Sequence, residues 1–417
     1  MTRASLSKNI GWALAGNAIY GMSQWGIIIA IAKCGTEAMV GQMALAWAVT
    51  TPILVFSSLQ LRSLWLSRAY PQYSFAAFAR ARVLFTSLAL LAVMPVSLAL
   101  GYRGNMLTTV GVVGLAKGID AVVDIHLGRL QAKEELNFVA KVLFVDGALA
   151  FVAAATAMWL WRDLTLAALG SALGPLAAWA MVARPTGRKG RLALDGQLRS
   201  LLRLGLLGLP LGIVVALVAA QASVPRFFLE KHAGLGELGV FAAISQLTNV
   251  GSNVVSSVAT ATCPRLAQMF SKEDYQGFRN LTWRLAGLGL LMGVCGALLS
   301  AVLGKLILTR VYAPEYSRGA NALVWLSVAA GLSYAGSFLG HSMTMAKQVR
   351  IQVPLFCAVV FVTLGACAGL VPAWGLNGAI AGAAAGSIVQ IVTSGLVLRS
   401  AERAQVQAGG IHTRGGL

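Results

Sequence analysis

Long apolar stretches recur along the whole chain and alternate with short polar junctions. Each stretch has about 20 residues or more, which is the length that a helix needs to cross the roughly 30 Å hydrocarbon core of a bilayer. Because a backbone in lipid must satisfy its own hydrogen bonds, this pattern predicts an all-α polytopic membrane protein. We expect twelve transmembrane helices, over residues 9–32, 38–60, 83–101, 106–127, 141–161, 163–183, 204–226, 237–262, 283–303, 320–344, 350–371 and 375–398.

The composition supports the same class of protein. Of the 417 residues, 57% are hydrophobic and only 11% are charged, whereas a soluble domain has about 25% charged residues. The five cysteines lie in or beside apolar stretches, without CxxC or Cys/His spacing. We therefore expect an integral membrane protein without a disulfide framework, a metal site or a cofactor.

The net charge of +19 is explained by membrane topology rather than by nucleic-acid binding. Lys and Arg are dispersed among the junctions, and no nucleic-acid-binding motif accompanies them. With the N-terminus placed inside, 24 of the 33 Lys and Arg residues fall on the cytoplasmic side, eight fall outside, and Lys117 lies within a span. This asymmetry follows the positive-inside rule and predicts that both termini are cytoplasmic.

An internal duplication relates the two halves of the chain. The first half contains LQAKEELNFVAKVLF followed by WRDLTLAALGSALG, and the second half repeats this as TMAKQVRIQVPLF followed by AWGLNGAIAGAAAG. Each half has six spans in the same orientation, so we expect two six-helix lobes related by a pseudo-two-fold axis along the membrane normal. The expected parts are an N-terminal lobe (1–183), a basic cytoplasmic linker (184–203), a C-terminal lobe (204–400) and a disordered cytoplasmic tail (401–417).

Three ionisable residues lie within one predicted span. Lys117, Asp120 and Asp124 are spaced three and four residues apart, so they share one helix face. An ionisable group near the bilayer centre costs roughly 2.5–3.5 kcal/mol on insertion scales, so such a face points to a protein interior or a wet cavity. The span is therefore predicted to be one helix of a transporter bundle with a polar interior.

Several segments make the chain resemble one family of transporters from end to end. They are KNIGWALAGNAIYGMSQW, the run from Lys117 to Gln131, SVPRFFLEKHAGLGELGVFAA, the turn at residues 264–267, and LVPAWGLNGAIAGA. The resemblance is to the polysaccharide flippases, especially the O-antigen type, of the multidrug/oligosaccharidyl-lipid/polysaccharide exporter superfamily. It implies twelve spans in two lobes, a bacterial inner-membrane location, and transport of undecaprenyl-pyrophosphate-linked oligosaccharides for lipopolysaccharide or other polysaccharide biosynthesis.

Four cations at span ends are candidates for contact with the pyrophosphate. Lys33 and Arg226 end the first and seventh spans, which flank the central cleft in the resembled superfamily; the alternative is that both snorkel to the membrane interface. Arg62 and Arg265 follow the second and eighth spans, where the alternative is the ordinary positive-inside excess. Arg suits the role because its planar guanidinium holds phosphate oxygens in two-point contact.

The intramembrane charges leave two compatible interpretations open. One is a transport role, in which Lys117 contacts the pyrophosphate and the carboxyl groups of Asp120, Asp124 and Asp146 couple transport to protons. The other is a structural ion pair that ties the fourth span to its neighbours, with Asp146 on the fifth span as a partner.

The favoured function is a flippase that works by alternating access about a cationic cavity, while the polyprenyl tail stays in lipid. The alternative within the superfamily is a drug/cation antiporter; the first lobe's aspartates suit it, but the second lobe's spans contain almost no acids. A membrane enzyme, such as a polymerase or ligase, needs a large external loop, and the longest external junction has 16 residues (304–319). The expected partners are the lipid-linked glycan, membrane lipid and other glycan-assembly membrane proteins, without nucleic acid.

Overall fold

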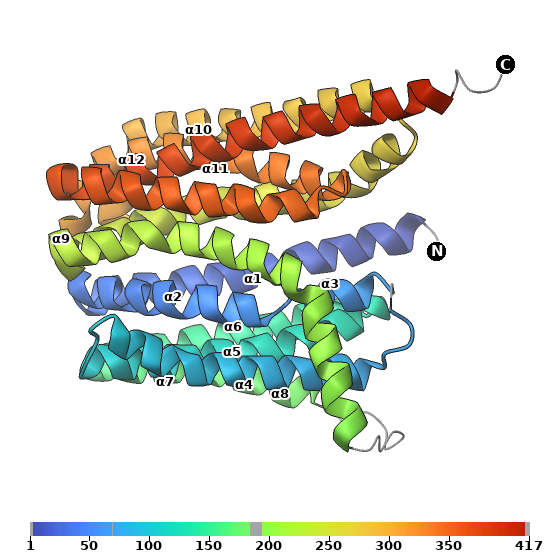
Figure 1. The fold of residues 1–417 in the computed structure, drawn as a ribbon. Helices are drawn as coiled ribbons and strands as arrows, with labels where there is room; N and C mark the ends of the chain where they lie inside the picture. The colour runs from blue at the N-terminus through green and yellow to red at the C-terminus, as the bar shows by residue number, and fades with distance from the viewer. Residues whose placement is uncertain (1–2, 69, 184–193, 413–417) are drawn as a thin grey trace. The chain divides into compact units, whose positions relative to one another are not determined.

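The described part of the computed structural model, residues 3–68, 70–183 and 194–412, consists of helices joined by short turns (Figure 1). No strand occurs in these three ranges, so the expectation of an all-α protein is confirmed there. The helices are α1 (Arg3–Cys34), α2 (Glu37–Ser57), α3 (Leu61–Leu66), α4 (Phe75–Ala99), α5 (Asn105–Ala132), α6 (Leu136–Trp161), α7 (Leu164–Ser171), α8 (Leu173–Val182), α9 (Leu194–Ser271), α10 (Tyr275–Val311), the 3-10 helix η1 (Pro314–Gly319), α11 (Ala320–Met345) and α12 (Val349–His412).

Nine helices in the described ranges are long and apolar enough to cross a membrane. Two of them, α9 and α12, each contain a pair of predicted spans. The backbone breaks at Gly234 (φ 82°) in α9 and at Gly375 (φ 51°) in α12. Glycine adopts positive φ without steric cost, so the chain turns from one span into the next with very little loop.

Two predicted parts extend beyond the described residues. Residues 184–193 of the predicted linker and 413–417 of the predicted tail lie outside the described ranges. The helix α12 continues to His412, so most of the tail is helical where we expected disorder. The tail sequence SAERAQVQ is rich in residues of high helix propensity, which accounts for this correction.

Packing divides the chain into two compact units, which are described separately. Unit 1 comprises the residues up to Glu230 together with Gly234–Ala242, and unit 2 comprises Lys231–Ala233 and the residues from Ala243 onward. In unit 1, α1 packs against α6, both α2 and α4 pack against α5, and α6 packs against α7 and α8. In unit 2, α11 packs against α10 and α12. The lobe boundaries expected from the sequence repeat stay a prediction.

The second predicted span is broken near its end, and the break positions Arg62. Helix α2 stops at Ser57, and Leu59 and Gln60 adopt positive φ angles of 45° and 49° before α3 begins. Non-glycine residues rarely adopt this conformation, which costs about 1–2 kcal/mol per residue. The change of direction places Arg62 on a short separate helix that packs against α5.

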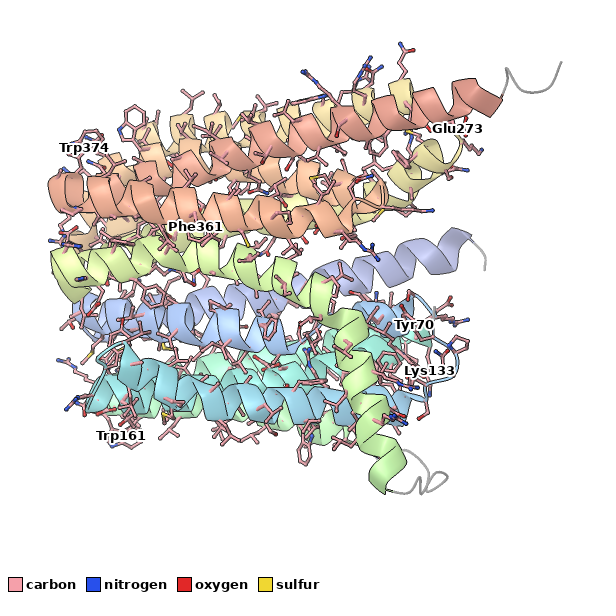
Figure 2. All side chains as sticks on the ribbon, in the orientation of Figure 1. Tyr70, Lys133, Trp161, Glu273, Phe361 and Trp374 are labelled. Atoms are coloured by element: carbon pink, nitrogen blue, oxygen red, sulfur yellow. The ribbon has the colours of Figure 1, made fainter. Side chains whose placement is uncertain are left out.

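An exposed tryptophan lies at one end of the helices of each unit. In unit 1, Trp161 lies at the opposite end of the helices from Tyr70 and Lys133, and in unit 2 Trp374 lies opposite Glu273 (Figure 2). Both tryptophans are 62% exposed. Exposed, amphipathic indole rings at helix ends are typical of membrane–water interfaces.

Candidate functional site

Two cations from different helices of unit 1 lie near each other. Lys117 on α5 places its Nζ atom 5.5 Å from the centroid of the Trp47 ring, a cation–π contact. Arg226 on α9 is close enough for its positive charge to act on Lys117. The Nε atom of Arg226 is buried and has no hydrogen-bond partner among the described residues. The structure therefore brings together two predicted site residues as neighbouring like charges.

A carboxyl pair lies on the other side of Lys117. Asp120 on α5 accepts a hydrogen bond of 3.1 Å from the Tyr20 hydroxyl of α1. Asp146 of α6, whose residue exposure is only 2%, lies close enough to Asp120 for the two carboxyl groups to interact. The ionisable side chains of α5, α6 and α9 thus form one cluster in unit 1: Lys117, Asp120, Asp146 and Arg226.

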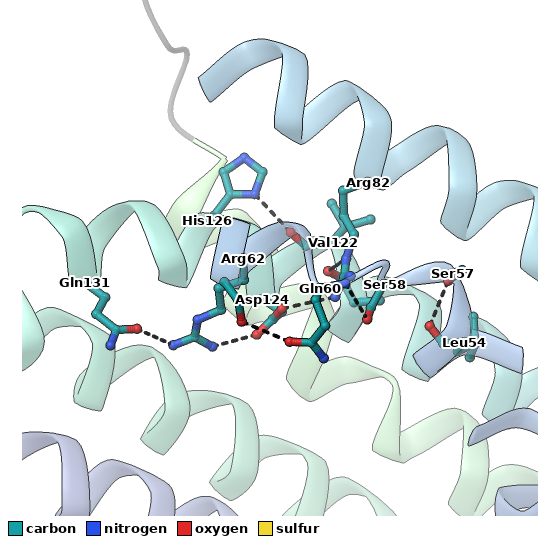
Figure 3. A network of polar contacts seen from close by, with 12 residues as sticks. Leu54, Ser57, Ser58, Gln60, Arg62, Arg82, Val122, Asp124, His126 and Gln131 are labelled. Atoms are coloured by element: carbon teal, nitrogen blue, oxygen red, sulfur yellow. Dashed lines mark hydrogen bonds and ion pairs between the residues drawn. The ribbon is translucent and has the colours of Figure 1, made fainter. Parts of the chain in front are cut away.

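Asp124 belongs to a second cluster, at the end of α5 that lies toward α3 (Figure 3). Its Oδ1 atom pairs with Nη1 of Arg62 at 2.6 Å, and its Oδ2 atom pairs with Nη2 of Arg82 at 3.1 Å. Arg62 also donates to Oε1 of Gln131 at 2.8 Å, and Nε of Arg82 donates to the main-chain oxygen of Ala121 at 2.6 Å. One carboxylate thus holds two guanidinium groups in fixed positions.

The two arginines of this second cluster differ in accessibility. The side chain of Arg82 is 5% exposed, whereas those of Arg62 and Asp124 are 33% and 37% exposed. Arg82 is therefore an internal anchor for Asp124, and Arg62 is the more accessible of the two arginines. For Asp124, the geometry is that of the ion pair that was one of our two interpretations.

Asp124→Asn is expected to destabilise the protein by about 1–3 kcal/mol, because it leaves the buried Arg82 guanidinium without its counter-charge. Thermal unfolding of the purified protein in detergent would measure this as a lower Tm. Asp163→Asn is a matched control, since Asp163 is exposed at the start of α7. The double variant Arg82→Leu/Asp124→Asn should recover part of the loss; a single Asp124→Asn variant with unchanged Tm would contradict the anchoring role.

Lys33 and Arg265 lie outside both clusters. Lys33 is exposed in the last turn of α1, and Arg265 is exposed on the second half of α9. Arg265 belongs to unit 2, so no contact between it and the unit 1 cations is described. Their predicted contact with the substrate stays a prediction.

Sequence reasoning missed Arg82, Tyr20 and Gln131. Arg82 ends a predicted cytoplasmic junction, where the positive-inside rule already explains a basic residue. A signal was nevertheless present, because Phe78, Arg82 and Thr86 share one face of α4 and are all buried. A charge in the middle of a buried stripe requires an internal partner. Tyr20 and Gln131 carried no comparable signal.

A close helix crossing lies near the start of α2. A Cβ atom added at Gly41 would meet the main-chain oxygen of Leu235, and one added at Gly239 would meet that of Glu37. The added Cβ at Gly41 would also lie 3.1 Å from the main-chain nitrogen of Gly239. Small residues allow membrane helices to approach this closely. Gly41 and Gly239 both belong to unit 1, so this crossing is a packing contact within that unit.

Comparison with solved structures defines the class of fold. A multidrug resistance MATE family transporter of the MOP superfamily, in an inward-facing conformation, matches with a TM-score of 0.70 and 14% identity, over 95% of this chain and 99% of that chain. The lipid II flippase MurJ, in an inward closed conformation, matches with a TM-score of 0.71 and 10% identity, over 92% and 86%. The chain has the fold of MOP-superfamily transporters.

One relative matches the chain over most of its length. The capsular polysaccharide biosynthesis protein CapF of Staphylococcus aureus is 24% identical over 383 residues, which cover 89% of this chain and 94% of the relative. No family model matches the chain. Together with the fold, this relative confirms the resemblance predicted from the sequence segments.

Proposed function

We propose that this protein is a flippase that moves an undecaprenyl-pyrophosphate-linked oligosaccharide, an O-antigen or similar repeat unit, from the cytoplasmic to the periplasmic leaflet of a bacterial inner membrane. The observation that carries this proposal is the Lys117–Arg226 pair, two neighbouring cationic side chains on α5 and α9. A pyrophosphate has two or more negative charges and balances such a pair. The relative in capsular polysaccharide biosynthesis and the likeness to a lipid II flippase support a lipid-linked glycan.

The proposed architecture is twelve transmembrane helices in two lobes, with both termini in the cytoplasm. Counting α9 and α12 as two spans each, and adding α1, brings the nine helices to twelve. The pyrophosphate and glycan cross inside the protein while the polyprenyl tail remains in lipid. The protein itself catalyses no reaction, and gradients or downstream consumption of the glycan drive the transport.

In this mechanism Arg62 receives the pyrophosphate from the cytoplasmic side. Its guanidinium holds one carboxylate oxygen of Asp124 at 2.6 Å and Oε1 of Gln131 at 2.8 Å, and the same two nitrogen atoms can hold two phosphate oxygens. A phosphate oxygen replaces Asp124 at Arg62, while Arg82 keeps Asp124 in place. Lys33 and Arg265 supply further positive charge along the path.

Alternating access requires that one side of the path closes while the other opens. The predicted topology puts the start of α2 on the periplasmic side, so the Gly41–Gly239 crossing is the periplasmic closure. Opening this crossing releases the substrate outward. The rest of the mechanism is a movement of the two lobes about the cationic cluster.

The proposal is tested by ligand binding to the purified protein in nanodiscs. We expect undecaprenyl pyrophosphate to bind, and undecaprenol, which has the same tail without phosphate, to bind at least tenfold more weakly. Equal affinity for the two lipids would contradict the proposed function, because the cationic cluster would then have no part in recognition.

Drug/cation antiport is the second candidate function, and the Asp120–Asp146 pair favours it. A proton shared between two carboxyl groups can be exchanged for a cationic substrate, and the fold is also that of a MATE transporter. In this case an organic cation such as ethidium would bind and release protons, and Asp120→Asn would abolish both effects. The flippase function instead predicts neither ethidium binding nor proton release.

The topology yields a direct test on two exposed residues of unit 2. Glu273 lies between α9 and α10, and Glu315 lies in η1. In a background that lacks the five native cysteines, Glu315→Cys should react in intact cells with an impermeant thiol reagent. Glu273→Cys should react only after the membrane is opened. The reverse pattern would overturn the proposed orientation.

A further inference from the structure

A band of neutral polar side chains follows one face of the second half of α9. With 100° between successive residues of a helix, these side chains fall within about 60° of the direction of Asn249. The stretch between Glu237 and Arg265 contains no charged residue. We call this band the polar face; it consists of Ser245, Gln246, Asn249, Ser252, Asn253, Ser256 and Thr260.

The packing within unit 2 fixes which way the polar face points. The flank of the helix next to Ser252 is buried, with Ile244 0%, Val255 2% and Ala259 1% exposed. On that side, the hydroxyl of Tyr334 from α11 donates to the main-chain oxygen of Thr248. Asn249, Ser252, Asn253, Ser256 and Thr260 are all exposed.

Hydrocarbon cannot be the neighbour of this face. Asn253 lies near the middle of the helix between the break at Gly234 and the end at Ser271, and so near membrane mid-depth. Beside the polar face runs an exposed apolar strip, with Val250 52% and Val254 47% exposed, which suits contact with lipid. Polar groups placed in hydrocarbon without hydrogen-bond partners are strongly disfavoured. The polar face therefore borders a water-filled space.

The central asparagine of the polar face, Asn253, has hydrogen-bonding capacity available, whereas Ser252 interacts with the Tyr334 hydroxyl. Asn249 donates from Nδ2 to Oε1 of Gln246 at 2.5 Å, and Thr260 donates to the main-chain oxygen of Ser256 at 2.8 Å. The Asn253 side-chain amide forms no hydrogen bond among the described residues, and it offers both a donor and an acceptor group. These groups are neutral, so they match neutral partners that donate and accept, not a phosphate or a metal ion.

We propose that the polar face of α9 binds the sugar portion of the lipid-linked substrate. Sugar hydroxyl groups are neutral and both donate and accept, as the asparagine amides and the serine and threonine hydroxyls do. The proposal rests on the proposed function and concerns unit 2 alone: the polar face takes the neutral glycan and offers no charged group to the pyrophosphate. Recognition of the sugar is thus separate from recognition of the charge.

The first test is thiol labelling at neighbouring positions in nanodiscs, in a background that lacks the five native cysteines. Asn253→Cys should react with a small water-soluble methanethiosulfonate, whereas Val254→Cys, one residue away at the same depth, should not. Lipid-linked oligosaccharide extracted from the host cells should slow the reaction of Asn253→Cys at least fivefold, and undecaprenyl pyrophosphate should not. An unreactive Asn253→Cys, or equal protection by both lipids, would overturn the proposal.

The second test measures binding of the same two lipids to variants. Asn249→Leu/Asn253→Leu should weaken binding of the lipid-linked oligosaccharide about tenfold, since several hydrogen bonds are lost, and leave undecaprenyl pyrophosphate unaffected. Thr262→Val is the matched control, because the Thr262 hydroxyl on the opposite face bonds to main-chain oxygens of its own helix.

Unchanged oligosaccharide affinity in the double variant would refute the sugar site alone. Failure of the unsubstituted protein to bind either lipid would instead refute the proposed function. A gain of dimer in the double variant would show that a second copy of the chain covers this face.

Discussion

Arg226→Ala is expected to lower glycan export about 100-fold while the protein remains fully folded in the membrane. The guanidinium is proposed to hold the pyrophosphate together with Lys117, and removal of one partner of a desolvated charge pair costs about 2–5 kcal/mol. A loss near 3 kcal/mol corresponds to about two orders of magnitude in affinity. Export in a cell that lacks its own flippase, normalised to the amount of protein in the membrane, would measure the effect.

The change in Tm on replacing Arg226 distinguishes a binding role of this residue from a structural role. Arg226 has a buried Nε atom without a hydrogen-bond partner among the described residues, and it repels Lys117, so Arg226→Leu should leave the Tm unchanged or raise it. If Arg226 were part of a structural ion pair, its replacement would lower the Tm. Arg226→Lys should restore export partly, because the charge is kept but the planar fork is lost.

A useful control is Arg318→Ala, which removes an exposed cation from η1 and should leave export unchanged. Full export in Arg226→Ala would remove the observation on which the proposed function rests. Loss of export with a matching loss of membrane protein would show that Arg226 is needed for folding. The measurement of Tm separates these outcomes.

The helical spacing of Lys117, Asp120 and Asp124 correctly indicated one polar face of α5, but the partners could not be derived from it. Residues 117 and 124 are two turns apart, about 10 Å along the axis. Over this distance the neighbours of α5 change, so Asp120 meets Tyr20 of α1 while Asp124 meets Arg62 and Arg82. Helical periodicity predicts the face of α5 on which a residue lies. Its contact partners depend on the helices that pack against that face.

The spans themselves were predictable because the lipid imposes their length and composition. The ends of the spans were less predictable from the sequence. The sequence offers Gly234 and Gly236 in HAGLGEL without a polar loop, and only the backbone shows that Gly234 carries the turn, with φ 82°. Likewise the close approach of Gly41 to Gly239 joins two segments almost 200 residues apart, and the hydrophobic pattern does not indicate that they touch.

Gly41→Leu is expected to abolish export by holding the periplasmic side open. A Cβ atom at Gly41 already meets the main-chain oxygen of Leu235, so a leucine side chain cannot be accommodated unless α2 and the second half of α9 separate. If this crossing is the periplasmic closure, its separation gives an external reagent access to the region around Trp47 and Lys117. In a background without native cysteines, Trp47→Cys should therefore react with an impermeant thiol reagent from outside at least tenfold faster when combined with Gly41→Leu.

The matched control is Gly365→Leu, which adds the same side chain to a helix at a position where an added Cβ meets nothing within 4 Å. It should retain export and the slow labelling of Trp47→Cys. Gly41→Ala, with a single added carbon atom, should fall between the two because the helices need to move only slightly. If Gly41→Leu left both export and labelling unchanged, the crossing would be an ordinary packing contact, and the periplasmic closure would have to lie elsewhere on the path. Faster labelling with normal export would show that opening at this crossing does not limit transport.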